Sequence, residues 1–212
     1  MLEYEYLAIE GVIGVGKTSL AKLLAQRMGA KLILEEVEEN PFLEGFYSDA
    51  ERYAFQTQIF FLLSRYRQLS NLFQGELFHR GMVCDYILAK DKIFAYLNLN
   101  DDELSLYNRL YALLEDKVPL PDLVVYLQAG TDFLLKRIKE RGRPFEQAIS
   151  RSYIDSLCQA YNHFFFHYDQ TPLLIVQTEG LDFIERAGDL EWLLKELANP
   201  PGGTRYVNPK GR

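Results

Sequence analysis

The sequence predicts an α/β fold in which helices cover both faces of a parallel sheet. Short apolar runs of strand type alternate along the chain with longer segments whose apolar residues recur at helical spacing. A glycine-rich loop joins the first run to the first helical segment, as is typical of strand-to-helix turns. No internal repeat is visible, and 212 residues of which 48% are apolar can bury the core of one large domain.

The first elements follow from apolar runs and the residues that bound them. Residues 4–9 form an apolar run that predicts a buried strand. After the glycine loop, helical spacing over residues 18–28 ends before Gly29, which is a natural C-cap. Residues 31–35 are a second short apolar run, so we expect a second strand before the turn-forming Asn40-Pro41.

The middle of the chain is expected to be mostly helical. Apolar and aromatic residues recur at helical spacing over residues 51–73, which predicts a long helix. Residues 82–84 predict a third strand that ends at Asp85. Two further helices are expected over residues 87–96 and 101–114.

The last third repeats the alternation. Residues 123–127 predict a fourth strand, and Thr131 is expected to cap a helix over 132–140. The remaining expected elements are a helix over 149–168, a strand over 173–177 and a helix over 184–197. We therefore expect a single domain over residues 1–198 and a disordered tail over residues 199–212.

Composition narrows the partners that the chain can have. The formal net charge of −7 argues against a surface that neutralises DNA or RNA, so no nucleic-acid polymer is expected as a partner. Cys84 and Cys158 lack metal-ligand spacing and suit a reducing compartment. No apolar run reaches membrane-spanning length, and the first residues do not have the pattern of a signal peptide. We expect a cytoplasmic protein that binds no membrane.

The glycine loop GVIGVGKT satisfies the pattern G-x-x-x-x-G-K-[ST] and lies between an expected strand and an expected helix. Its glycines let backbone N–H groups point at an anion, and the new helix adds its positive N-terminal dipole. Lys17 is expected to reach the β- and γ-phosphates, and the Thr18 hydroxyl to bind Mg²⁺. The residues expected to bind the nucleotide are Gly11, Gly14, Gly16, Lys17, Thr18, Ser19 and Arg137.

A phosphate loop is shared by GTPase switches, motor ATPases and small-molecule kinases. The sequence contains neither an N-K-x-D motif nor a D-x-x-G motif, which leaves a GTPase switch as a weak alternative. A kinase needs a group that orients or deprotonates an acceptor hydroxyl. Glu35 ends the second strand, at the edge of the sheet where ligands bind, and is the candidate base, whereas the following acidic residues read as a solvated loop. Asp85 ends the third strand and is the candidate metal carboxylate, with a helix cap as its alternative role.

A basic lid segment is expected over residues 137–146. Arg137, Lys139, Arg141 and Arg143 gather around Gly142 directly after a helix. A solvated basic face is the usual meaning of such a run. In an acidic protein that transfers phosphoryl groups, Arg141 and Arg143 are instead expected to close over the transferring group as catalytic residues.

Several segments together resemble the deoxynucleoside kinase family, especially its bacterial deoxyadenosine and deoxyguanosine kinases. The segments are IEGVIGVGKTS, EEVEENPFLEGFY, FQTQIFFLLSRYRQL, DYILAKDKIFA and RIKERGRPFE, within residues 6–168. The resemblance implies a P-loop kinase fold with a five-stranded parallel sheet, ATP or a related triphosphate with Mg²⁺, transfer to the 5′-hydroxyl of a deoxynucleoside, and a homodimer.

The resemblance also implies roles for single residues. Glu35 is similar to the family's general base, and Tyr47 with Glu146 to the pair that binds the sugar 3′-hydroxyl. Gln58 resembles the glutamine that pairs with the base edge, and Asp91 the aspartate near the base, where a carboxylate accepts from an amino group and disfavours thymidine.

The chain departs from the family pattern after Asp85, where many members carry an arginine and this sequence has Tyr86. Arg65 lies seven residues after Gln58, about two helical turns, and is a candidate substitute; a surface arginine is the alternative. We place Asp85, Tyr86 and Arg65 among the expected substrate-binding residues.

Deoxyadenosine is the first choice of acceptor, with deoxyguanosine or deoxycytidine next. A monophosphate kinase of the thymidylate kinase type is the alternative, disfavoured because a phosphate-bearing acceptor needs an arginine partner.

Overall fold

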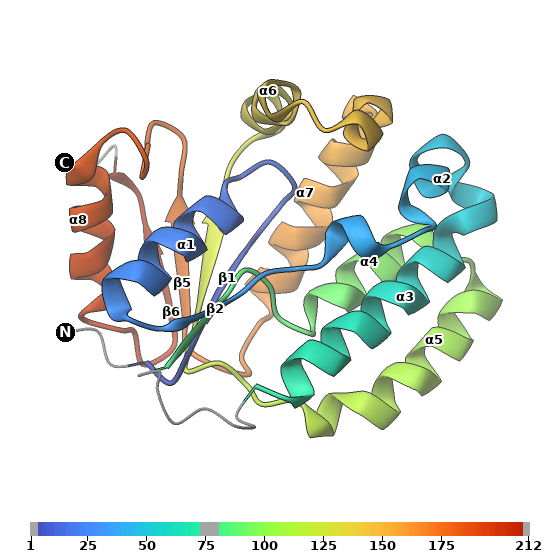
Figure 1. Ribbon diagram of the computed structural model, residues 1–212, viewed down its shortest axis with the longest axis horizontal. Coiled ribbons are helices and arrows are strands. Elements are labelled where there is room, and N and C mark those ends of the chain that lie inside the picture. The colour runs from blue at the N-terminus through green and yellow to red at the C-terminus, as the bar shows by residue number, and fades with distance from the viewer. Residues whose placement is uncertain (1–3, 73–80, 210–212) are drawn as a thin grey trace.

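The computed structural model describes residues 4–72 and 81–209, and its centre is a parallel sheet (Figure 1). The strand order is β2-β3-β1-β4-β5-β6, and every neighbouring pair is parallel. The strands are β1 (Tyr6–Gly11), β2 (Lys31–Ile33), β3 (Met82–Cys84), β4 (Leu123–Gln128), β5 (Leu173–Gln177) and β6 (Thr204–Val207). Because all strands point the same way, β1, β2 and β3 deliver their carboxyl ends to one edge of the sheet.

The sixth strand corrects two expectations, the five-stranded sheet and a tail disordered from residue 199. Strand β6 extends the sheet in register with β5, and the Leu173 amide donates to the Gly203 carbonyl at 3.0 Å. Prolines and glycines over residues 200–203 hid the strand, although Thr204, Tyr206 and Val207 favour extended backbone. Residues 210–212 of the expected tail, and residue 73 at the end of the expected long helix, lie outside the described residues.

Helices cover both faces of the sheet, as the alternating pattern predicts. Figure 1 shows α8 on one side of the sheet and α3, α4, α5 and α7 grouped on the other. The helices are α1 (Lys17–Met28), α2 (Leu43–Ser48), α3 (Ala50–Ser70), α4 (Lys90–Asn98), α5 (Asp101–Leu114), α6 (Thr131–Arg141), α7 (Arg151–Phe166) and α8 (Ala187–Leu197). Short 3₁₀ turns are η1 (Val37–Glu39), η2 (Glu115–Lys117) and η3 (Pro144–Ala148).

The helix boundaries follow local chemistry, with one exception. Gly29 ends α1 in the left-handed conformation, at φ 64°, as its position predicts. Asn100 and Glu103 form a capping box at the start of α5. The expected cap by Thr131 is wrong: Gly130 is the N-cap of α6, and the Thr131 hydroxyl donates to Asp155 Oδ1 at 2.5 Å instead.

One buried apolar core joins the sheet to the helices on both faces, and a smaller cluster of Leu43, Phe46 and Ala54 joins α2 to α3. The smaller cluster packs α2 against α3, and α2 also contacts the turn η3. Within residues 4–72 and 81–209, no helix is long and apolar enough to cross a membrane.

Candidate active site

The phosphate loop follows β1 directly, and its glycines are required by its conformation. Gly11, Gly14 and Gly16 have φ angles of 150°, 86° and 105°, which side chains disfavour. A Cβ on Gly14 would lie 2.7 Å from Ile138 Cγ1, and one on Gly11 would lie 2.6 Å from the Leu127 carbonyl oxygen. The loop is therefore packed closely between β4 and α6, and α1 begins immediately after it at Lys17.

Lys17 lies against its own loop. Its Nζ donates to the carbonyl oxygens of Gly11 at 2.7 Å and Val12 at 3.3 Å. Burial, and then the neighbouring ammonium of Lys90, lower the pKa of Lys17 to about 8. The carboxylates of Glu10, Glu35 and Asp85 lie near Lys17 as well and act in the opposite direction, so charges of both signs meet at this part of the site.

The two expected metal ligands are brought together. Thr18 Oγ1 donates to Asp85 Oδ2 at 2.6 Å, although the residues are far apart in sequence. Oxygen donors of this kind suit Mg²⁺, which usually takes one or two protein ligands and completes its shell with phosphates and water. Consistent with that habit, the described residues hold no group of three or more His, Cys, Asp or Glu side chains that could bind a metal by themselves.

Glu10 is a functional residue that sequence reasoning missed. It is fully buried at the end of β1, where its carboxylate accepts from the Gly11 amide at 3.0 Å and from the Ile87 amide at 2.8 Å. These bonds tie the start of the phosphate loop to the segment that carries Asp85. The signal was a carboxylate in an otherwise apolar strand, which must have a buried partner.

A cavity of about 450 Å³ extends from the phosphate loop to α2 and α3. It gathers most of the expected site residues, namely Gly14, Lys17, Thr18, Glu35, Tyr47, Gln58, Arg65, Asp85, Arg141, Arg143 and Glu146. Its volume suits a small molecule, since such sites span roughly 300–1,000 Å³. Gly16, Ser19 and Arg137 line a separate small recess instead, and Gly11, Tyr86 and Asp91 line neither.

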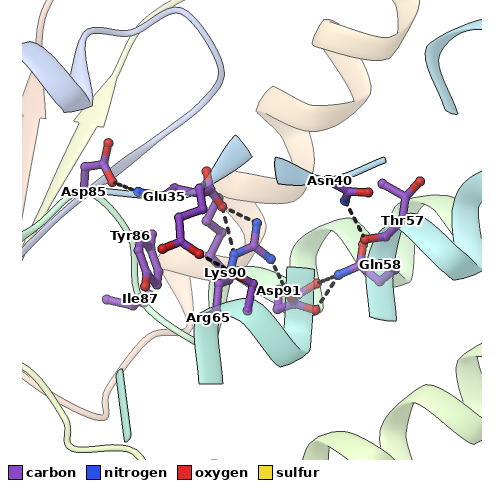
Figure 2. Close-up of polar contacts among 12 residues, drawn as sticks. Glu35, Asn40, Thr57, Gln58, Arg65, Asp85, Tyr86, Ile87, Lys90 and Asp91 are labelled. Carbon is purple, nitrogen blue, oxygen red and sulfur yellow. Dashed lines mark hydrogen bonds and ion pairs between the residues drawn. The ribbon is translucent and has the colours of Figure 1, made fainter. Parts of the chain in front are cut away.

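Glu35 is the most constrained side chain in the cavity (Figure 2). Its Oε1 accepts from Arg65 Nε at 2.8 Å and from Arg65 Nη2, and its Oε2 accepts from Lys90 Nζ at 2.8 Å. Burial alone would raise the pKa of Glu35, but Lys90 and Arg65 outweigh burial and hold the pKa well below its usual range. Glu35 is therefore ionised at neutral pH. Lys90, which sequence reasoning did not select, is only 3% exposed.

Asp91 does not face the cavity, which corrects its expected contact with the base. Its carboxylate is fully buried and accepts from Gln58 Nε2, from Arg65 Nη1 and from the Tyr107 hydroxyl at 2.8 Å. Burial raises the pKa of Asp91 in spite of Arg65. Asp91 is thus a positioning residue that holds Gln58 and Arg65 in place, because it is fully buried and does not line the cavity.

The side chains of Arg65 and Tyr86 lie in different surroundings. Arg65 faces the same way as Gln58, as the spacing predicts, because both contact Asp91 and both line the cavity. It is 4% exposed, so it is not a surface arginine. Tyr86 is fully buried and its hydroxyl donates to Gln68 Oε1 at 2.5 Å. Its placement among the substrate-binding residues was wrong, because its side chain points into the core.

The basic lid segment contains the C-terminal end of α6, a left-handed Gly142 at φ 67° and the turn η3. Arg141 Nε donates to Glu146 Oε2 at 3.1 Å, while Arg143 pairs with Glu38 at 3.6 Å. The Tyr47 ring stacks on Phe145 at a centroid distance of 6.3 Å, which places it beside Glu146 at the mouth of the cavity. Both lid arginines are thus paired with carboxylates.

These elements define an enzyme of the phosphate-loop phosphotransferase class: an anion-binding loop, paired oxygen ligands and an ionised carboxylate around one small-molecule cavity. Comparison with known proteins narrows the class. The model of the family described as "Deoxynucleoside kinase" matches residues 7–199, so the chain belongs to the deoxynucleoside kinase family. It is therefore a kinase of nucleoside salvage.

Individual relatives agree with the family. The chain is 37% identical to a deoxyguanosine kinase of Bacillus subtilis (strain 168), over 91% of this chain and 97% of the relative. It is 33% identical to the deoxyadenosine/deoxycytidine kinase of the same organism, over 91% of each chain. Among solved structures, deoxyadenosine kinase from M. mycoides with the products dCMP and a flexible dCDP bound superposes with a TM-score of 0.80 at 29% identity, covering 91% of this chain and 98% of that one.

Proposed function

We propose that the protein transfers the γ-phosphate of ATP, as its Mg²⁺ complex, to the 5′-hydroxyl of a deoxynucleoside, with deoxyadenosine the preferred acceptor. The observation that carries this proposal is an ionised, largely buried Glu35 that lines the same cavity as Lys17. A hydroxyl between them can give its proton to Glu35 while Lys17 and the loop amides hold the donor phosphates.

The chain's own residues divide the work. Glu35 accepts the proton of the acceptor hydroxyl and fixes its direction, and Arg65 and Lys90 hold the Glu35 carboxylate in one orientation. Thr18 and Asp85 would hold Mg²⁺, which supplies positive charge to the triphosphate when bound. Arg141 and Arg143 exchange their carboxylate partners for the transferring group when the lid segment closes.

Gln58 supports selection by the base. Its Nε2 donates to two acceptors of Asp91, the backbone carbonyl at 2.9 Å and the carboxylate, so the orientation of the amide is fixed. The Oε1 atom makes no hydrogen bond to any residue in the described part of the chain, and Gln58 lines the cavity. An exocyclic amino group of adenine, cytosine or guanine can donate to this oxygen, whereas thymine has none.

We also propose that the enzyme works as a homodimer in the cytoplasm. Tyr96 on α4 and Phe166 on α7 are 61% and 83% exposed, and large exposed apolar rings of this kind are candidates for a subunit contact. Cys84 and Cys158 are free thiols, which suits a reducing compartment. Sedimentation of the purified protein would test the dimer, and a monomer at micromolar concentration would contradict it.

The decisive experiment is a panel of acceptors assayed with ATP and magnesium. Deoxyadenosine, deoxyguanosine, deoxycytidine, thymidine, adenosine and deoxyadenosine 5′-monophosphate are compared by kcat/KM. We expect 5′-phosphorylation of the amino-bearing deoxynucleosides, deoxyadenosine first, and little turnover of thymidine or of the monophosphate. Phosphorylation of the monophosphate alone, or of thymidine as well as deoxyadenosine, would refute the proposal.

A further inference from the structure

Lys90 is a buried cation in the cavity whose hydrogen-bonding capacity is mostly unused. It is the first residue of α4, it is 3% exposed, and it lines the cavity. An ammonium has three donors. One of them serves Glu35 Oε2 at 2.8 Å, and the nearest ring, Phe94, has its centroid 5.8 Å from Nζ. Between residues 4–72 and 81–209, no other acceptor is bonded to it.

Two other cations of the cavity that lie near Glu35 are committed to partners. Arg65 uses Nε and Nη2 on Glu35 and Nη1 on Asp91. Lys17 is bonded to two carbonyl oxygens of the phosphate loop. Lys90 is therefore the cation next to Glu35 that retains donors for a ligand. Because it lies beside this carboxylate, it also lies where the proposed acceptor hydroxyl would bind.

We propose that Lys90 is a catalytic residue: its free N–H donors bind the 5′-oxygen of the acceptor during transfer and then the phosphoryl group of the product. This inference rests on the proposed 5′-phosphorylation. Tyr86, the residue next to the strand-end carboxylate Asp85, cannot supply this charge because its side chain is buried and bonded to Gln68.

The reaction itself requires a cation at this point. The bond between the 5′-oxygen and the γ-phosphorus forms as the bond from that phosphorus to the β–γ bridging oxygen breaks. The electron pair of the broken bond stays on the nucleoside diphosphate, and the hydroxyl proton passes to Glu35 and then to solvent. An uncharged hydroxyl thus becomes a phosphate monoester with about two negative charges beside the Glu35 carboxylate. A cation that bridges Glu35 and the 5′-oxygen offsets the repulsion that this transfer creates.

Electrostatics around Lys90 agree with an anion in this place. Lys90 lies close enough to Lys17 to contribute to the lowered pKa of Lys17. Two buried ammoniums that repel each other are stabilised together when an anion enters between them. The phosphoryl group passes from the side of Lys17 to the side of Lys90, so each cation contacts it at one end of the transfer.

The test separates the charge of Lys90 from its bulk by comparing ligands with and without a 5′-phosphate. Titration calorimetry measures the affinity of Lys90→Met, Lys90→Gln and Lys90→Arg for the deoxynucleoside and for its 5′-monophosphate. The matched control is Lys92→Met, because Lys92 lies on the same helix, is 33% exposed and pairs with Glu115 at 3.2 Å.

We expect Lys90→Met and Lys90→Gln to weaken binding of the monophosphate about 10- to 100-fold, as for the loss of a hydrogen bond to a charged group. The affinity for the nucleoside should stay almost unchanged. The same variants should lose kcat by about 10²- to 10³-fold. Lys90→Arg should recover most of the monophosphate affinity and most of kcat. Lys92→Met should resemble wild type in both ligand affinities and in kcat.

Two results would overturn the proposal. Wild-type monophosphate affinity and kcat in Lys90→Gln would remove Lys90 from the reaction. An equal loss of affinity for both ligands in folded Lys90→Gln and Lys90→Met, not repaired by arginine, would reduce Lys90 to a packing role. Both are distinct from failure of the proposed function, in which wild-type enzyme phosphorylates no deoxynucleoside.

Discussion

The two ends of the cavity are built in different ways. The phosphate end is a short contiguous loop that offers backbone amides to an anion, with Lys17 and Thr18 at the start of α1. The acceptor end is assembled from single side chains on separate elements. Glu35 follows β2, Gln58 and Arg65 belong to α3, and Lys90 and Asp91 belong to α4.

This difference has an energetic counterpart. Backbone groups of the phosphate loop are held by the chain geometry and need little further support. At the acceptor end, a chain of ion pairs and hydrogen bonds runs from Gln58 through Asp91 and Arg65 to Glu35 (Figure 2). Such a network is sensitive to each of its members, because a lost partner leaves a buried charge unsatisfied.

The largest effect is expected for Glu35→Gln, which removes the proton acceptor and keeps the shape of the side chain. We expect kcat to fall by about 10²- to 10⁴-fold, the usual contribution of general base catalysis. Steady-state kinetics with saturating ATP measure it, and Glu36→Gln is the matched control, since Glu36 bonds to Ser64 and Arg67 instead. Wild-type turnover in Glu35→Gln would mean that the acceptor end needs no base.

Asp91→Asn tests whether the acceptor end is a connected network. Loss of the charge leaves the buried Arg65 with one carboxylate partner in place of two. We therefore expect the free energy of unfolding, measured in urea, to fall by about 3–5 kcal/mol. Asp102→Asn, on the exposed side of α5, is the control. A changed base profile without a loss of stability would instead show that Asp91 contacts the base itself.

Lys17→Ala probes the phosphate end alone. Loss of one preorganised charge should lower kcat by about 10²- to 10³-fold and weaken binding of the triphosphate. Binding of the deoxynucleoside should stay close to wild type, because Lys17 is bonded only to its own loop in the structure. Calorimetry with each ligand separately measures both effects, and equal weakening of the two ligands would contradict the division of the cavity into two ends.

The same contrast explains what the sequence could predict. The fold, the phosphate loop and the pairing of Thr18 with Asp85 follow from local patterns, because parallel strands end at one edge and the loop motif is contiguous. Glu35 could be selected by its position after an apolar run. The side-by-side placement of Gln58 and Arg65 followed from helical spacing alone.

Contacts between side chains on different helices and strands could not be predicted from the sequence in this way. Lys90 belongs to an ordinary amphipathic segment, and only the packing of α4 beneath residue 35 makes it a buried partner of Glu35. Asp91 and Tyr86 were expected in the cavity, but a position in a helix or just after a strand does not fix what the side chain packs against. Strand β6 was missed because flanking prolines and glycines dominate the composition of the tail.

The smallest effect is expected for Gln58→Met, which tests base selection at the far edge of the network. Methionine keeps the length of the side chain but removes the free Oε1, so one hydrogen bond of about 0.5–1.5 kcal/mol to an amino group is lost. The substitution also removes the Nε2 bonds to Asp91. We expect kcat/KM for deoxyadenosine to fall about tenfold, and that for the poor substrate thymidine to stay level, so the ratio between them narrows. Gln68→Met is the matched control on the same helix, because Gln68 bonds to Tyr86 and to the Leu34 carbonyl and does not line the cavity. A parallel loss for both nucleosides would mean that Gln58 acts only by holding Asp91, and that the base is read by another part of the acceptor end.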